Sequence, residues 1–184
     1  DKKQLSQDDL LLLEQYEPNE GQNMLYSFFT PVWLCYVMVQ LAIKHGYEPD
    51  KHTVLEPAAG TGNFLTVLPN PKLVTAIELD KTNHKIASLR NPKIEIINGY
   101  FEQLFLAPPR NTIIYKGAKG EISHDKNYPF DLVIGNPPYG KNSNLYSSYF
   151  KSPKIAQMEV FFMYKSLQLL KSGGLMVFIT ASGF

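Results

Sequence analysis

The sequence predicts an α/β domain with a mostly parallel sheet and helices on both of its faces. Short apolar segments alternate with amphipathic ones along most of the chain, and glycine- and proline-containing turns separate them. Strands that are separated by helices form βαβ units, which pair in parallel through right-handed crossovers. A length of 184 residues suits one domain, and 44% hydrophobic residues suffice for a packed core.

Two helices are expected before the first strand, in an N-terminal arm that covers residues 1–50. The first covers residues 5–16. The second begins at Thr30-Pro31, because threonine caps helices well and proline suits the first helical position. It runs to about His45.

Residues 51–184 then alternate between strands and helices. The expected strands cover residues 53–56, 73–78, 93–97, 130–135 and 175–180, and the expected helices cover residues 63–68, 80–90 and 155–171. Asp80 caps the second of these helices, and Gly173-Gly174 ends the third. Residues 107–129 interrupt the alternation, so this long connection is either functional or a local excursion.

Composition excludes several classes of protein. The net charge of +1 argues against an overall basic surface, and the single cysteine, Cys35, excludes an internal disulfide framework. No Cys/His cluster has the spacing of a zinc site, and the longest apolar run is too short to span a bilayer. No secretory signal pattern opens the chain. We expect no metal, no membrane association and a cytoplasmic location.

A glycine-containing turn, Glu56–Gly62, follows the first strand. Gly60 and Gly62 allow a tight turn and a close approach of the backbone to a ligand. The Lys-Ser/Thr pair of a phosphate-binding loop is missing, which argues against a triphosphate. Glu78 ends the second strand, 16 residues beyond Gly62, where a carboxylate can accept both hydroxyls of a ribose. Two other interpretations stay open at this point: a turn with a purely structural role, and the cofactor site of a dinucleotide oxidoreductase.

The segment Asn136-Pro137-Pro138-Tyr139 follows the fourth strand, at the edge where open α/β sheets bind ligands. Two successive prolines remove two backbone donors and stiffen the loop. The Asn136 side-chain oxygen and a nearby carbonyl could therefore hold an amino group, and Tyr139 offers a flat face to a planar substrate. This segment predicts an amine as the reacting group.

The ordered set Phe28–Pro31, Glu56–Gly62, Ile77–Asp80 and Asn136–Tyr139 resembles the S-adenosylmethionine-dependent N6-adenine DNA methyltransferases. The Thr-Pro pair ahead of the glycine turn is similar to the gamma arrangement of that family. The resemblance implies a Rossmann-like class I methyltransferase fold, S-adenosylmethionine as cofactor, DNA as partner and a place in a restriction-modification system. It also implies direct methyl transfer to the N6 amino group of adenine.

The resemblance assigns a role to each matching position. The methionine end of the cofactor would be surrounded by Thr30, Pro31, Glu56, Pro57, Ala58, Gly60 and Gly62. Glu78 would bind the ribose, and Leu79 and Phe101 would pack on the cofactor adenine; Tyr100 and Asn136 complete the cofactor-binding set. Asn136 and Pro137, stiffened by Pro138, would hold the target amine, and Tyr139 would stack on the target base. The family usually has an Asp where this chain has Tyr100. Asn98 or Glu102 could replace that Asp, or the cofactor could bind weakly.

Three alternatives stay open. Asn-Pro-Pro-Tyr also occurs in methyltransferases that modify a guanine amine of ribosomal RNA or a glutamine of release factors, although the early Phe-Phe-Thr-Pro block favours DNA. A non-catalytic methyltransferase-like module is the third. Five strands of an expected seven lead us to expect an N-terminal part of a larger protein, whose target recognition domain is absent here. The oligomeric state stays open.

Overall fold

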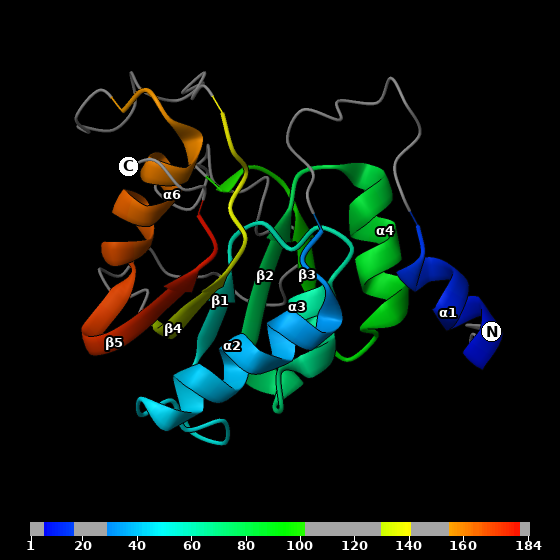
Figure 1. Cartoon of the computed structure of the whole chain (residues 1–184), viewed down its shortest axis with the longest axis horizontal. Coiled ribbons are helices and arrows are strands. Elements are labelled where there is room, and N and C mark those ends of the chain that lie inside the picture. Colours follow the sequence, from blue (N-terminus) through cyan, green and yellow to red (C-terminus); the bar gives the residue numbers. More distant parts are fainter. Residues whose placement is uncertain (1–5, 17–28, 102–129, 141–154, 181–184) are drawn as a thin grey trace.

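The computed structural model describes residues 6–16, 29–101, 130–140 and 155–180. They form a five-stranded parallel sheet with the strand order β3-β2-β1-β4-β5 (Figure 1). The strands are β1 (Val54–Glu56), β2 (Val74–Glu78), β3 (Ile96–Asn98), β4 (Phe130–Gly135) and β5 (Leu170–Phe178). The helices are α1 (Gln7–Glu14), α2 (Val32–Lys44), α3 (Asn63–Val67), the short 3₁₀ helix η1 (Pro71–Leu73), α4 (Lys81–Arg90) and α6 (Met158–Leu167).

Helices cover both faces of the sheet, as the sequence predicts. Successive residues of a strand point to opposite faces, so Val54 faces the core under α2, α3 and α4, whereas Leu55 faces the core under α6. The same alternation places Leu132 and Val133 of β4 in opposite cores. Strands β1 and β4 are buried on both faces and are apolar almost throughout, which is typical of parallel sheets, whereas β5 is partly exposed.

The start of α2 differs from the prediction. Pro31 occupies the cap position and no side chain caps the helix. The prediction that Thr30 caps it is therefore wrong, and the buried Thr30 instead uses its backbone carbonyl to accept hydrogen bonds from Asn63 Nδ2 at 2.8 Å and Cys35 Sγ at 3.6 Å. The cap of α4 is confirmed: Asp80 Oδ1 accepts from the Thr82 and Asn83 amides at 2.8 Å.

The boundary between α6 and β5 also differs from the prediction. The helix ends at Leu167 and β5 begins at Leu170, so Gly173-Gly174 lies inside the strand instead of ending the helix. Phe130 pairs with Leu170, but Leu132 pairs with Leu175, so β5 bulges between these two pairs. Gly173 has a φ of +83°, which permits the bulge.

The third strand is shorter and later than predicted. It begins at Ile96, because a turn closed by the Ile94 amide on the Asn91 carbonyl at 3.0 Å occupies the preceding residues. Expectations for Phe28, Glu102 and residues 107–129 lie outside the described residues. In the part of the chain that the structure describes, no helix is long and apolar enough to cross a bilayer.

Candidate functional site

The polar segments that the sequence singles out meet at one edge of the sheet. Glu56, Glu78 and Asn98 end the neighbouring strands β1, β2 and β3, and Asn136 directly follows β4. The strand order reverses between β1 and β4, and such switch points are where open α/β sheets bind ligands. The structure therefore brings these four residues, far apart in the sequence, to the same end of the sheet.

The glycine turn contacts β2 and the segment that precedes α2. The Ala59 amide donates to the Ile77 carbonyl at 2.8 Å, and the Gly62 amide closes the turn on the Ala59 carbonyl at 2.8 Å. Gly60 has a φ of +55°, and a Cβ there would lie 3.1 Å from the Phe29 ring. The absence of a side chain at Gly60 therefore lets the turn pack against the segment that carries Thr30.

Gly62 packs closely against the C-terminal end of α4. Its φ is +83°, and a Cβ there would lie 2.6 Å from Asn91 Nδ2 and 3.1 Å from Ala87 Cβ. Gly62 therefore lets the turn pack closely against α4 and the residue that follows it. The close approach of a ligand to the Gly62 backbone stays a prediction.

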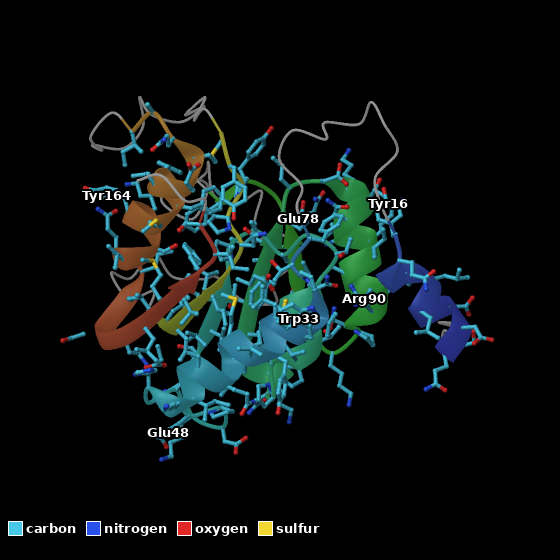
Figure 2. The ribbon with its side chains drawn as sticks, in the orientation of Figure 1. Tyr16, Trp33, Glu48, Glu78, Arg90 and Tyr164 are labelled. Atoms are coloured by element: carbon cyan, nitrogen blue, oxygen red, sulfur yellow. The ribbon has the colours of Figure 1, made fainter. Side chains whose placement is uncertain are left out.

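Glu78 joins β2 to the glycine turn (Figure 2). Its carboxylate accepts a hydrogen bond from the Gly60 amide at Oε2 and one from the Asp80 amide at Oε1, both at 2.7 Å. The side chain is only 8% exposed. Burial raises the pKa of this carboxyl to about 7, although the two amides oppose the shift.

The titration of Glu78 predicts a pH dependence of stability. The folded protein binds this proton more tightly than the unfolded chain, whose carboxyl keeps a pKa near 4.5. We expect the free energy of unfolding to be highest below pH 4.5 on this account and to fall by about 3 kcal/mol as the pH rises through 7. Urea denaturation between pH 5 and 8, at about half-unit steps, measures this slope.

The matched variant is Glu78→Gln, which keeps the shape but cannot titrate. Its unfolding free energy should change less with pH across the same interval, whatever its absolute stability. Equal slopes in the two proteins would show that Glu78 does not carry the effect.

Four buried polar atoms lack a hydrogen-bond partner within the described ranges: Thr30 Oγ1, Glu56 Oε2, Tyr47 Oη and Ser166 Oγ. The first two belong to the segments that meet at the glycine turn. Glu56 is 1% exposed, and burial together with the nearby Glu78 charge raises the pKa of its carboxyl well above the ordinary value. Buried polar groups normally have partners. A bound ligand with an ammonium donor and a carboxylate acceptor, such as the methionine end of S-adenosylmethionine, fits Glu56 Oε2 and Thr30 Oγ1.

Asn136 and Tyr139 contact each other in the loop after β4. The Tyr139 hydroxyl donates to Asn136 Oδ1 at 2.6 Å, and it also lies 3.2 Å from the Ile179 carbonyl oxygen after β5. A side-chain amide oxygen has two lone pairs, so Asn136 Oδ1 can accept a second hydrogen bond from a substrate amine.

The predicted adenine-binding residues occupy different environments. Leu79 is exposed, whereas Phe101 is 2% exposed and stacks on Phe162 with the ring centroids 4.5 Å apart. Asn98 Nδ2 donates to the Glu78 and Leu79 carbonyls at 2.8 and 3.0 Å. These contacts fix the orientation of the Asn98 amide, so its Oδ1 remains the atom that could read an exocyclic amine in place of the usual Asp.

The remaining predicted residues differ in their exposure to solvent. Pro31 is exposed, Pro57 and Pro137 are buried, and Ala58, Tyr100 and Pro138 are partly buried. Sequence reasoning missed two residues that hold the turn: Asn63 and Arg90. A basic residue at the end of a helix is ordinarily solvated, and only its burial, which the sequence does not reveal, distinguishes Arg90.

The five-stranded parallel sheet with helices on both faces matches the class I S-adenosylmethionine-dependent methyltransferase fold. Residues 51–184 match the model of the Eco57I restriction-modification methylase family. The chain belongs to this family. The predictions of a class I fold, of S-adenosylmethionine as cofactor and of a restriction-modification methylase agree with these findings.

Three known proteins illustrate the similarity. The Defense against restriction protein B of Escherichia phage P1 is 29% identical over 133 residues, which are 72% of this chain and 5% of that protein. A protein from Listeria monocytogenes, described as a class I S-adenosylmethionine-dependent methyltransferase, has a TM-score of 0.62 at 15% identity over 95% of this chain and 53% of its own. A type I restriction-modification methyltransferase subunit from Streptococcus thermophilus has a TM-score of 0.53 at 19% identity over 83% and 34%. This chain thus spans only a small part of the phage protein and about a third to a half of the solved chains.

Proposed function

We propose that this chain carries the catalytic region of a DNA methyltransferase that transfers a methyl group from S-adenosylmethionine to the N6 amino group of adenine. The observation that carries the proposal is the place of Asn136–Tyr139. It follows β4 at the sheet edge that also holds Glu56 and Glu78, and Asn136 Oδ1 already accepts a hydrogen bond from Tyr139. The family, a restriction-modification methylase, supports DNA as the substrate.

The cofactor supplies an electrophilic methyl group when it is bound. Thr30, Glu56 and Glu78 would hold it, because the first two present buried polar atoms without described partners and Glu78 presents a carboxylate suited to a ribose. Thr30 Oγ1 and Glu56 Oε2 would gain hydrogen-bond partners when the ligand binds. Binding would therefore remove the free-energy cost of burying two polar atoms without hydrogen bonds.

The target amine is a poor nucleophile, because its lone pair is delocalised into the base. Asn136 Oδ1 and the Pro137 carbonyl would each accept a hydrogen bond from the amine. These two hydrogen bonds would favour the pyramidal form of the amine, which attacks the methyl group. Pro137 and Pro138 carry no amide hydrogens, so the loop offers acceptors without competing local donors. Catalysis is then mostly a matter of positioning, and no covalent enzyme intermediate is needed.

Tyr139→Phe tests the part of the hydroxyl in this arrangement. The variant keeps the stacking ring but loses the hydrogen bond that orients Asn136. We expect the rate of methyl transfer to fall about tenfold, while cofactor affinity stays unchanged, because one neutral hydrogen bond is worth about 1 kcal/mol. Single-turnover kinetics with labelled S-adenosylmethionine give the rate, and calorimetry gives the affinity. An unchanged rate would remove the hydroxyl from the mechanism.

We further propose that residues 1–50 form a helical arm, that residues 51–184 bind the cofactor, and that a recognition region elsewhere in the complete protein contacts DNA. A base in duplex DNA would have to leave the stack to reach the Asn136 loop. Because the recognition region would supply the main DNA contacts, residues 1–184 need no basic surface of their own.

In the deciding experiment, the full-length protein is incubated with labelled S-adenosylmethionine and with DNA, ribosomal RNA and a release factor as possible methyl acceptors. Label recovered as N6-methyladenine in DNA is the expected result. Label in a guanine of the RNA or in a glutamine of the release factor would assign the Asn136 loop to one of those substrates. A protein that binds no S-adenosylmethionine by calorimetry would be a non-catalytic module.

A further inference from the structure

We propose that Arg90 is a positioning residue for the cofactor site: it holds the glycine turn and the Thr30 segment in register through Asn63, without touching the cofactor itself. The inference rests on the proposed function only in taking S-adenosylmethionine as the ligand. Arg90 is the last residue of α4 (Figure 2). It is only 9% exposed. A guanidinium so deeply buried needs hydrogen-bond partners, and those partners identify what it does.

The Arg90 guanidinium reaches the glycine turn. Its Nη1 donates to the Thr61 carbonyl at 2.8 Å and also to Asn63 Oδ1. One guanidinium nitrogen carries two hydrogens in a fixed plane, so it can bond two acceptors at once while their directions stay fixed. Arg90 thus holds a backbone group inside the turn and a side chain directly after it.

Asn63 passes this constraint on to the Thr30 segment. Its Oδ1 faces Arg90, so its Nδ2 must face the other way, and it donates to the Thr30 carbonyl at 2.8 Å. An amide that bonds a cation at one end is oriented unambiguously. The turn and the segment, separated by about thirty residues of sequence, are therefore joined by two successive side chains.

The register of these two segments decides whether the cofactor can be held. Thr30 Oγ1 and Glu56 Oε2 are two of the four buried atoms without described partners, and each belongs to one of the two segments. Phe29 also limits how the segments pack, because its ring lies 3.1 Å from where a Cβ on Gly60 would be. A small shift between the segments would separate the two groups that must bind one ligand together.

Helix α4 is anchored at both ends to the same site. Its cap residue, Asp80, donates its amide to Glu78, and Asn91 Nδ2, just past its C-terminal end, lies 3.3 Å from the Gly62 carbonyl. Arg90 adds the contact that reaches furthest into the turn. Helix α4 therefore fixes the position of the Glu78 carboxylate relative to the glycine turn.

The test compares Arg90→Met with Ile86→Val in the full-length protein. Methionine keeps a long apolar stem but removes both donors, whereas Ile86→Val makes a packing loss at a buried position of the same helix outside the network. We expect Arg90→Met to raise the Kd and KM for S-adenosylmethionine about tenfold or more, with kcat at saturating cofactor within about twofold of wild type. Arg90→Lys, which keeps the charge but not the planar fork, should recover only part of the affinity.

A second variant keeps the inference falsifiable where Arg90→Met fails to fold. Asn63→Asp leaves the oxygen that faces Arg90 but replaces the donor to Thr30 with an acceptor. We expect it to raise the Kd in the same way as Arg90→Met.

The outcomes separate the two hypotheses. A Kd that rises no more than in Ile86→Val, or a kcat that falls as much as kcat/KM, would overturn the positioning role of Arg90. A wild-type protein that binds no S-adenosylmethionine would instead overturn the proposed function. Calorimetry, which does not depend on the methyl acceptor, gives the Kd values, and steady-state kinetics give kcat and KM.

Discussion

Replacing Asn136 by Ala should lower the rate of methyl transfer by about 10²–10³-fold, the loss that follows removal of one preorganised polar group aimed at the reacting centre. The substitution removes the oxygen that accepts from Tyr139 and that, in the proposed mechanism, accepts from the target amine. Cofactor affinity should change little, because Thr30, Glu56 and Glu78 remain. Single-turnover transfer to DNA and calorimetry with S-adenosylmethionine measure the two quantities separately.

Asn136→Asp is the matched control. The aspartate keeps an oxygen at the same position, so it can still accept from Tyr139 and from an amine, and it should retain more activity than the alanine variant. Wild-type rates in Asn136→Ala would show that the amine is held elsewhere. Equal losses in both variants would show that the amide group, and not an acceptor oxygen, is what the reaction needs.

The sheet could be predicted because each strand is short, apolar and bounded by local signals. Residues 130–135 show this best, since the predicted and observed strands coincide. The end of α6 could not be predicted, because Leu170 joins β5 by pairing with Phe130, forty residues earlier in the sequence. The local sequence pattern does not reveal such a long-range pairing. The two glycines that seemed to end the helix instead permit a bulge, since Gly173 adopts a positive φ.

The site shows the same division. Glu56, Glu78 and Asn136 were found because parallel strands bring their carboxyl ends to one edge, so position in the sequence implies position in space. Arg90, Asn63 and the Thr30 carbonyl were missed because they are joined by side chains across helices. No periodicity encodes such a network, and each member looks ordinary in its own segment.

The second large effect is expected at Gly62. Gly62→Val should lower the free energy of unfolding by about 3 kcal/mol or more and abolish cofactor binding, because a Cβ would lie 2.6 Å from Asn91 Nδ2 and the φ of +83° disfavours a β-branched residue. Urea denaturation and calorimetry give the two losses. Gly173→Val is the matched control, since Gly173 has the same φ of +83° but nothing within 4 Å of its Cβ position. It should show the backbone penalty alone.

A double mutant decides what the missing side chain at Gly62 protects. If the crowding is with α4, Asn91→Ala should restore part of the stability and affinity that Gly62→Ala loses, because it removes the atom 2.6 Å from the new Cβ. If the glycine instead clears space for the ligand, removing the Asn91 side chain cannot help, and the two losses should add. The contacts with Asn91 and Ala87 lead us to expect rescue, so that Gly62 acts on the cofactor through α4, the helix that Arg90 also ties to the turn.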